Sequence, residues 1–159
     1  MPGYRFLLLL LCFALPTVAS AQREKIPPRD LKTVKEKWPN ATREPIGLYT
    51  ELLREGTGPK AQRGHHVEVY YEGFLIDGTK FDEAQPDKGT FKFQLDRGMV
   101  IKGWEFGILM MHVGERRRII VPYELAYGTA GRAPDIPRMA TLIFDVELVS
   151  VSDTRPETP

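Results

Sequence analysis

Cysteine is nearly absent from this chain of 159 residues: the single one, Cys12, lies within a short apolar run from Phe6 to Leu15. That run is too short to span a bilayer as a resident helix. A basic residue precedes it, a proline follows it, and Ala19-Ser20-Ala21 has the small-residue pattern of a cleavage site. We therefore predict a signal peptide over residues 1–21, with a buried N-terminal helix as the alternative. Cleavage would leave an exported chain without cysteine, which excludes disulfide bonds and thiol chemistry.

A charge excess of either sign is also missing. Lysine and arginine total 22 against 21 aspartates and glutamates, and loss of Arg5 with the signal peptide would make the mature chain formally neutral. This balance favours neither nucleic acid nor an acidic membrane surface as a partner. Arg116-Arg117-Arg118 is the one basic run that we considered as a docking patch. Only alternate residues of a strand share a face, so we expect a solvated face instead.

Conventional catalytic groups are scarce. The chain has three histidines, and it has neither a nucleophile-elbow motif nor a glycine-rich phosphate loop. His65-His66 is a candidate metal pair, but neighbouring residues of a strand point to opposite faces. We therefore expect solvated loop histidines, and we predict neither a metal nor a cofactor.

Proline and charged residues dominate residues 22–46, which we interpret as an arm that is loosely docked or free in solvent. Leu31, Val34 and Trp38 fall on one face of a short predicted helix, with Asp30 as its N-cap. Pro39 would end this helix.

From residue 47 the pattern changes to that of β-structure. Apolar and polar residues alternate over residues 67–75, 91–95 and 140–148, which is typical of half-buried strands, and residues 48–54 and 116–121 are also predicted strands. Asp77-Gly78 is typical of a hairpin turn. Apolar residues spaced by three and four from Ile101 to Met111 predict the one helix of this part of the chain. We predict an α+β domain over residues 47–151, a curved antiparallel sheet wrapped around one short helix, followed by a flexible tail at 152–159.

Aromatic residues are the candidates for a concave apolar site, although each taken alone is more often a core residue. They fall near predicted strand ends and around the predicted helix: Tyr71, Phe81, Phe91, Trp104, Tyr127 and Phe144.

Six motifs in order make residues 47–151 resemble the FKBP-type peptidyl-prolyl isomerases, the macrolide-binding immunophilins. They are Val69–Leu75, Asp77–Asp82, Phe91–Phe93, Val100–Trp104, Ala126–Gly128 and the pair Ile136-Pro137 with Ala140–Leu148. The resemblance implies an enzyme that accelerates rotation of Xaa-Pro bonds while exported proteins fold, by non-covalent binding and without a cofactor. It also implies macrolides as inhibitors. The predicted signal peptide implies a location in the periplasm or outside the cell, or in the ER lumen of a eukaryotic host. Since residues 22–46 are too short for the dimerising helix of some exported relatives, we expect a monomer.

The resemblance further implies the roles of individual residues. Trp104 would form the pocket floor, Ile136 would lie in a flap above it, and Tyr127 and Asp82, with Phe81 nearby, would be the catalytic groups. The expected walls of the substrate site are Tyr71, Phe91, Val100, Ile101 and Phe144. We leave open whether Asp82 contacts the substrate or only stabilises a turn.

Three residues depart from the family pattern: Asp96, where glycine is common, and Arg132 and Asp135 in the loop before Ile136. We hypothesise that Asp135 favours substrates with a basic residue near the proline. Two alternatives to an isomerase remain: a chaperone-like module that binds proline-containing segments with little turnover, and a docking domain whose arm engages a partner.

Overall fold

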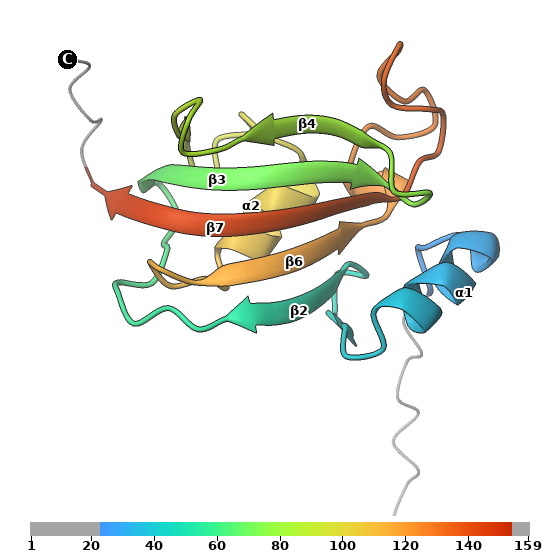
Figure 1. Ribbon diagram of the computed structural model, residues 1–159, viewed down its shortest axis with the longest axis horizontal. Coiled ribbons are helices and arrows are strands. Elements are labelled where there is room, and N and C mark those ends of the chain that lie inside the picture. Colours follow the sequence, from blue (N-terminus) through green and yellow to red (C-terminus); the bar gives the residue numbers. More distant parts are fainter. Residues whose placement is uncertain (1–22, 154–159) are drawn as a thin grey trace, which may run out of the picture.

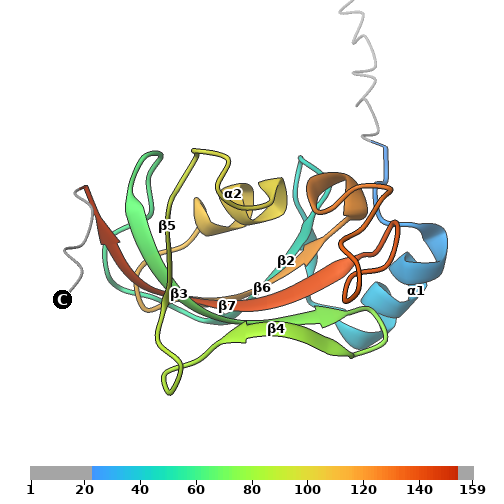
Figure 2. The same cartoon turned by 90° about the horizontal axis from the view of Figure 1, so that it is seen from above.

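The computed structural model describes residues 23–153 and has one antiparallel sheet with a helix on each side (Figures 1 and 2). The predicted signal peptide, 1–21, lies outside the described residues. The elements follow in the order α1 (Pro28–Lys37), β1 (Thr42–Arg43), β2 (Tyr49–Arg54), β3 (His66–Leu75), β4 (Lys80–Ala84), β5 (Phe91–Gln94), α2 (Lys102–Ile108), β6 (Arg116–Val121), a 3₁₀ turn (Tyr123–Leu125) and β7 (Leu142–Ser152). This α+β architecture confirms the predicted fold class. The last strand runs into the start of the predicted tail.

The sheet order is β1-β2-β6-β7-β3-β4, and β5 also pairs with β3. The long strand β3 thus has two partners on one side: its first half pairs with β5, up to Val69 opposite Phe91, and its second half pairs with β4, from Tyr71 opposite Ala84. Figure 2 shows the sheet curving around α2. Tyr71 lies at the point where β4 and β5 separate, on the face of β3 that packs against α2.

Two glycines let α2 lie directly on the sheet. A Cβ atom at Gly103 would be 2.3 Å from Cγ1 of Val121, and one at Gly107 would be 2.5 Å from Cδ1 of Ile119. Such distances are far inside van der Waals contact, so only glycine fits at these positions. Close packing of α2 against β6 fixes the height of Trp104, which lies between these two glycines.

The opposite face of the sheet is also covered, which corrects the expectation of a loosely docked or free arm. Ile26 and Val34 are each 1% exposed and form a second buried cluster with Tyr49, Ile120 and Ile143. Leu31 and Trp38 pack against this cluster, so the predicted apolar face of α1 is confirmed. Segment 23–46 is therefore part of the folded domain.

The predicted helix cap is wrong in one respect. The helix begins at Pro28, a residue type favoured in the first turn, so Asp30 lies inside the first turn and is not the N-cap. Its carboxylate is buried and accepts a hydrogen bond of 2.7 Å from the Thr141 hydroxyl. This contact joins the arm to the start of β7.

The arm is also held by Glu24. Its carboxylate accepts hydrogen bonds from the Tyr49 hydroxyl at 2.7 Å and from the Ile26 N–H at 2.9 Å, and Arg43 lies 3.4 Å away. Burial opposes ionisation, but these hydrogen bonds and the Arg43 charge together lower the pKa of Glu24. Burial, followed by the hydrogen bond to Glu24, raises the pKa of Tyr49 to about 12.

Replacing Glu24 with glutamine is expected to make the melting temperature fall less steeply as the pH is lowered from 7 to 3. A lowered folded-state pKa means that Glu24 stabilises the fold above its ordinary pKa of about 4.5, and that this contribution is lost as pH falls through the lowered value. The Tm of the variant should be below that of the wild type at pH 7, and the gap should narrow toward pH 3. Thermal melts between these pH values test this, with Glu36→Gln on the exposed side of α1 as control. A gap that is constant with pH would contradict it.

The basic run on β6 is more buried and better paired than expected. The guanidinium of Arg118 donates to both carboxylate oxygens of Asp145 at 2.7 and 2.8 Å and lies 5.5 Å from the Trp38 ring centroid. Arg117 donates to Glu115 at 2.6 Å, and its side chain is 14% exposed. The run therefore serves cross-strand and arm packing, and the predicted solvated face is wrong for these two residues.

His65 also differs from the expected solvated loop histidine, since its side chain is only 15% exposed and its Nε2 lies 3.1 Å from Asp153. His66 is the first residue of β3. Within residues 23–153, no three histidine, cysteine or carboxylate side chains cluster as a metal site would require.

Candidate functional site

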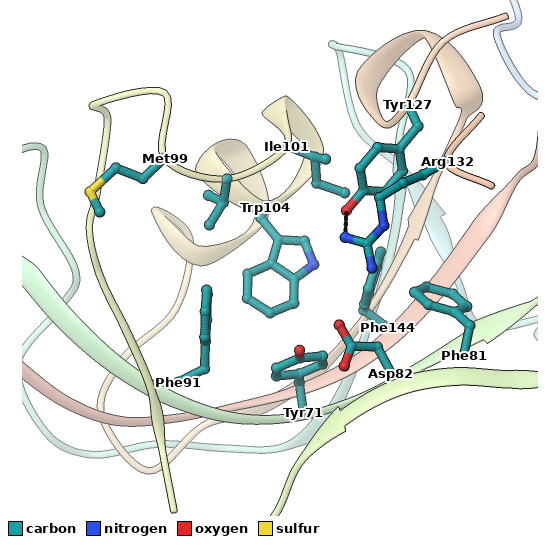
Figure 3. Close-up of a pocket in the computed structure, with 11 residues that line it drawn as sticks. Tyr71, Phe81, Asp82, Phe91, Met99, Ile101, Trp104, Tyr127, Arg132 and Phe144 are labelled. Carbon is teal, nitrogen blue, oxygen red and sulfur yellow. Dashed lines mark hydrogen bonds between the residues drawn. The ribbon is translucent and has the colours of Figure 1, made fainter. Parts of the chain in front are cut away.

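A cavity of about 220 Å³ opens on the concave side of the sheet between α2, β4 and the loop that precedes β7 (Figure 3). It is bordered by Tyr71 of β3, Phe81 and Asp82 of β4, Phe91 of β5, Met99, Val100 and Ile101 before α2, Trp104 of α2, Tyr127 and Arg132 of the loop, and Phe144 of β7.

Trp104 forms the floor of this cavity. Its ring meets those of Tyr71 and Phe144 edge-on, with centroid distances of 4.8 and 5.3 Å, and Phe91 stands 6.0 Å away. Edge-to-face contacts of this kind fix ring orientations. The indole Nε1 is buried and has no hydrogen-bond partner among the described residues.

Gly73 lets the aromatic wall close. The rings of Phe81 and Phe144 pack edge-on at 5.7 Å directly over this glycine, where a Cβ atom would be 2.9 Å from Phe81 and 3.1 Å from Phe144. The pairing of β3 with β4 also shifts register after Gly73. This irregularity directs Phe81 and Asp82 toward the cavity.

The polar end of the cavity is built around Asp82. Burial, and next the hydrogen bond and charge of Asp82, raise the pKa of the Tyr71 hydroxyl well above its usual range. The carboxylate also accepts the Glu83 N–H at 3.0 Å. Tyr71 therefore stays protonated at any physiological pH. Asp82 lies within β4 and faces the cavity, which favours a site role over a turn-stabilising one.

Tyr127 lies on the other side of the opening and is held by a closed loop. The backbones of Arg132 and Ile136 exchange two hydrogen bonds, at 2.9 and 2.8 Å, which makes residues 132–136 a small hairpin. Gly131 is required there, because its φ is +72° and a Cβ atom would lie 2.4 Å from the Pro137 carbonyl oxygen. Nη1 of Arg132 donates to the Tyr127 hydroxyl at 3.2 Å, leaving the hydroxyl proton free to point elsewhere.

The Ile101 N–H provides a second donor at the rim. Ile101 is the N-cap of α2 and its carbonyl accepts the first hydrogen bonds of the helix. Its own N–H has no acceptor within residues 23–153. The arrangement is thus an aromatic basin with two donors, from Tyr127 and Ile101, at its edge.

The structure brings together every predicted site residue except Ile136. That side chain is 2% exposed and belongs to the main hydrophobic core, because the hairpin folds it inward. Met99 and Arg132 border the cavity although neither was predicted as a site residue. For Arg132 the sequence did hold a signal, namely its departure from the family pattern. For Met99, whose side chain is 61% exposed, the sequence holds no such signal.

The other two departures lie away from the cavity. Asp135 is exposed at the hairpin tip and does not border it. Asp96 has a φ of +62°, the left-handed region where glycine is favoured, and its carboxylate pairs with Arg63 at 2.8 Å. It therefore occupies a turn and takes no part in the site.

A second, larger hollow of about 430 Å³ lies along α2, where Phe106 and Leu109 face Ile46 and Leu125. The carboxylate of Glu105 at its edge is already used by the backbone N–H groups of Asp96 and Gly98. Phe106 is its one aromatic lining residue, whereas six aromatic residues border the first cavity, so volume alone does not make it the functional site. None of the helices in residues 23–153 has the length and apolarity needed to cross a membrane.

Comparison with known proteins agrees with this geometry. The sequence model described as FKBP-type peptidyl-prolyl cis-trans isomerase matches residues 58–149. Human peptidyl-prolyl cis-trans isomerase FKBP2 is 46% identical over 92 residues, which is 58% of this chain and 65% of that protein. FK506-binding protein 4 of Rhizopus delemar is 44% identical over 110 residues, 69% of this chain and 28% of that protein. The chain thus spans between about a quarter and two thirds of the length of these relatives.

Solved structures give the same result. The crystal structure of AtFKBP13 superposes with a TM-score of 0.67 at 32% identity, covering 70% of this chain and 98% of the other. That of FkpA from Escherichia coli has a TM-score of 0.68 at 37% identity, covering 77% and 55%. The residues that the family model matches include strands β3 to β6, most of β7, α2 and every residue that borders the aromatic basin, and the chain belongs to the FKBP-type peptidyl-prolyl cis-trans isomerase family.

Proposed function

We propose that the chain is a peptidyl-prolyl isomerase that binds proline-containing segments over Trp104 and accelerates rotation of the Xaa-Pro bond. The observation that carries the proposal is the aromatic basin with two donors at its rim, whose bordering residues include no serine, cysteine or histidine and a single carboxylate. Rotation about this bond breaks amide resonance, and for a peptide bond that barrier is about 18–20 kcal/mol. It needs neither a covalent intermediate nor a cofactor.

The physical basis is differential binding. The planar amide is the more dipolar state, and the twisted transition state has lost part of that charge separation. An apolar basin therefore stabilises the twisted form relative to the planar one. The floor and walls hold the pyrrolidine ring while the preceding carbonyl swings toward the rim, where Tyr127 and the Ile101 N–H donate. Asp82 borders the basin and its charge helps to keep the Tyr71 hydroxyl protonated.

The setting that we propose is outside the cytoplasm, in the periplasm, the external medium or an ER lumen. The N-terminal pattern of residues 1–21 supports export. We further propose that macrolides of the FK506 class occupy the basin, since the relative from Rhizopus delemar is named for binding FK506. A monomer is the expected state, which sedimentation can test.

Replacing Tyr127 with phenylalanine is expected to slow isomerisation of a Leu-Pro peptide by about two- to tenfold, the effect of losing one hydrogen bond. Tyr123→Phe is the matched control, because its hydroxyl lies 3.5 Å from Glu124 and outside the basin. The measurement is the rate of cis-to-trans conversion with purified protein, with and without FK506. A folded wild type that binds the peptide without accelerating conversion would instead identify the binding-module alternative.

A further inference from the structure

Arg132 places a positive charge at the opening of the basin. Its guanidinium carbon lies 5.3 Å from the Tyr127 ring centroid, and Nη1 donates to the hydroxyl of the same residue (Figure 3). The flat guanidinium therefore stacks on Tyr127 and faces the cavity, with its position fixed at two points. The two backbone hydrogen bonds between Arg132 and Ile136 hold the base of this side chain.

No carboxylate neutralises this charge within residues 23–153. Arg132 has no acidic oxygen within 4.0 Å, unlike Arg118, which has both Asp145 and Glu51. Asp82 is the one acidic residue among those that border the cavity; its carboxylate accepts the Glu83 N–H and helps to raise the pKa of the Tyr71 hydroxyl. Since a guanidinium has five donors and a single one is used, Arg132 has free donors at the place where a substrate enters.

We infer that Arg132 makes this site select proline segments that carry an acidic side chain next to the proline. An arginine fork and a carboxylate form two parallel hydrogen bonds, whereas a basic neighbour of the proline is repelled. The selection is thus opposite to the one hypothesised from Asp135, whose side chain is exposed at the hairpin tip and away from the cavity. The inference rests on the proposed isomerase function and names its substrate class.

The expected size of the preference follows from the exposure of Arg132. Ion pairs at exposed positions change an equilibrium by about two- to fivefold at low salt, and salt screens them. The wild type should therefore show kcat/KM for a Glu-flanked peptide about two- to fivefold above that for an Arg-flanked one. In 0.5 M salt the two values should approach each other.

The test uses three peptides that differ only beside the proline, with Glu, Leu or Arg, and a second set with the same residues after the proline. Wild type, Arg132→Ala, Arg132→Lys and Asp135→Asn are compared by the ratio of Glu to Arg values, so that a general loss of turnover in a variant does not affect the result. We expect the ratio to fall to about one in Arg132→Ala, and to persist in Arg132→Lys and Asp135→Asn.

A wild-type ratio of one or below in both sets, or a ratio that survives in Arg132→Ala, would overturn the inference. A Glu-to-Arg ratio that increases in Asp135→Asn would show that Asp135 favours basic peptides in the wild type, and would support the earlier hypothesis instead. The Leu peptide reports separately on the proposed function, since its conversion does not depend on charge. If no peptide is turned over, the dissociation constants of the same peptides give the ratio, so the charge preference is decided even where catalysis fails.

Discussion

Replacement of Trp104 by leucine is expected to lower kcat/KM for a Leu-Pro peptide by about tenfold or more, equivalent to ~1.4 kcal/mol of lost transition-state stabilisation. The indole closes the floor of the basin and orients Tyr71, Phe91 and Phe144 through edge-on contacts. Leucine is apolar but shorter, so the proline ring would lose its flat support and the walls their fixed positions. Turnover at a temperature where both proteins are folded gives the result.

The second tryptophan supplies the control. Trp38 packs against the cluster on the opposite face of the sheet and beneath Arg118, away from the basin. Trp38→Leu should lower the melting temperature while leaving kcat/KM within about twofold of the wild type. Equal losses of turnover in both variants would mean that the basin around Trp104 is not the place of catalysis.

Replacement of Val34 by aspartate is expected to lower the free energy of unfolding by roughly 3–4 kcal/mol, because it buries a carboxylate without a partner. Val34 is 1% exposed between α1 and the outer face of the sheet. Denaturant titration of the purified protein measures the change.

Lys35→Asp is the matched control, because the neighbouring side chain on the same helix is exposed. It introduces the same residue and is expected to change stability by less than about 1 kcal/mol. Small and similar effects of both substitutions would contradict the finding that segment 23–46 is part of the fold.

The strands, the hairpin turn and α2 could be predicted because alternation, Asp77-Gly78 and the spacing from Ile101 are local signals. The packing of the arm was missed because it depends on contacts distant in sequence. A signal was present all the same: Ile119-Ile120-Val121 and Leu142-Ile143-Phe144 are continuous apolar runs, which are typical of strands buried on both faces. The predicted alternation over residues 140–148 puts Ile143 on the solvent face, where a polar residue would be expected.

For the site, too, local sequence patterns predict the residues of regular elements but not the packing of a loop. Residues carried by regular strands and by α2 lie where the motifs predicted them, since strand register decides which face each side chain occupies. The loop residues do not follow such a rule. Ile136 turns inward and Arg132 turns toward the cavity because one pair of backbone hydrogen bonds closes residues 132–136 into a hairpin. Nothing in the sequence pattern indicates that closure.

Strands β6 and β7 carry adjacent residues to opposite sides of one sheet: Phe144 borders the basin, and its neighbour Ile143 packs under the arm. Little of the surface of these strands faces solvent. Few of their positions could therefore change without affecting the packing on one side or the other. A change that reshapes one side shifts the backbone that the other side shares, so compensating changes must arise across the sheet. Arm and basin are therefore expected to diverge together among descendants of this chain, while the exposed hairpin residues 132–135 are free to vary independently.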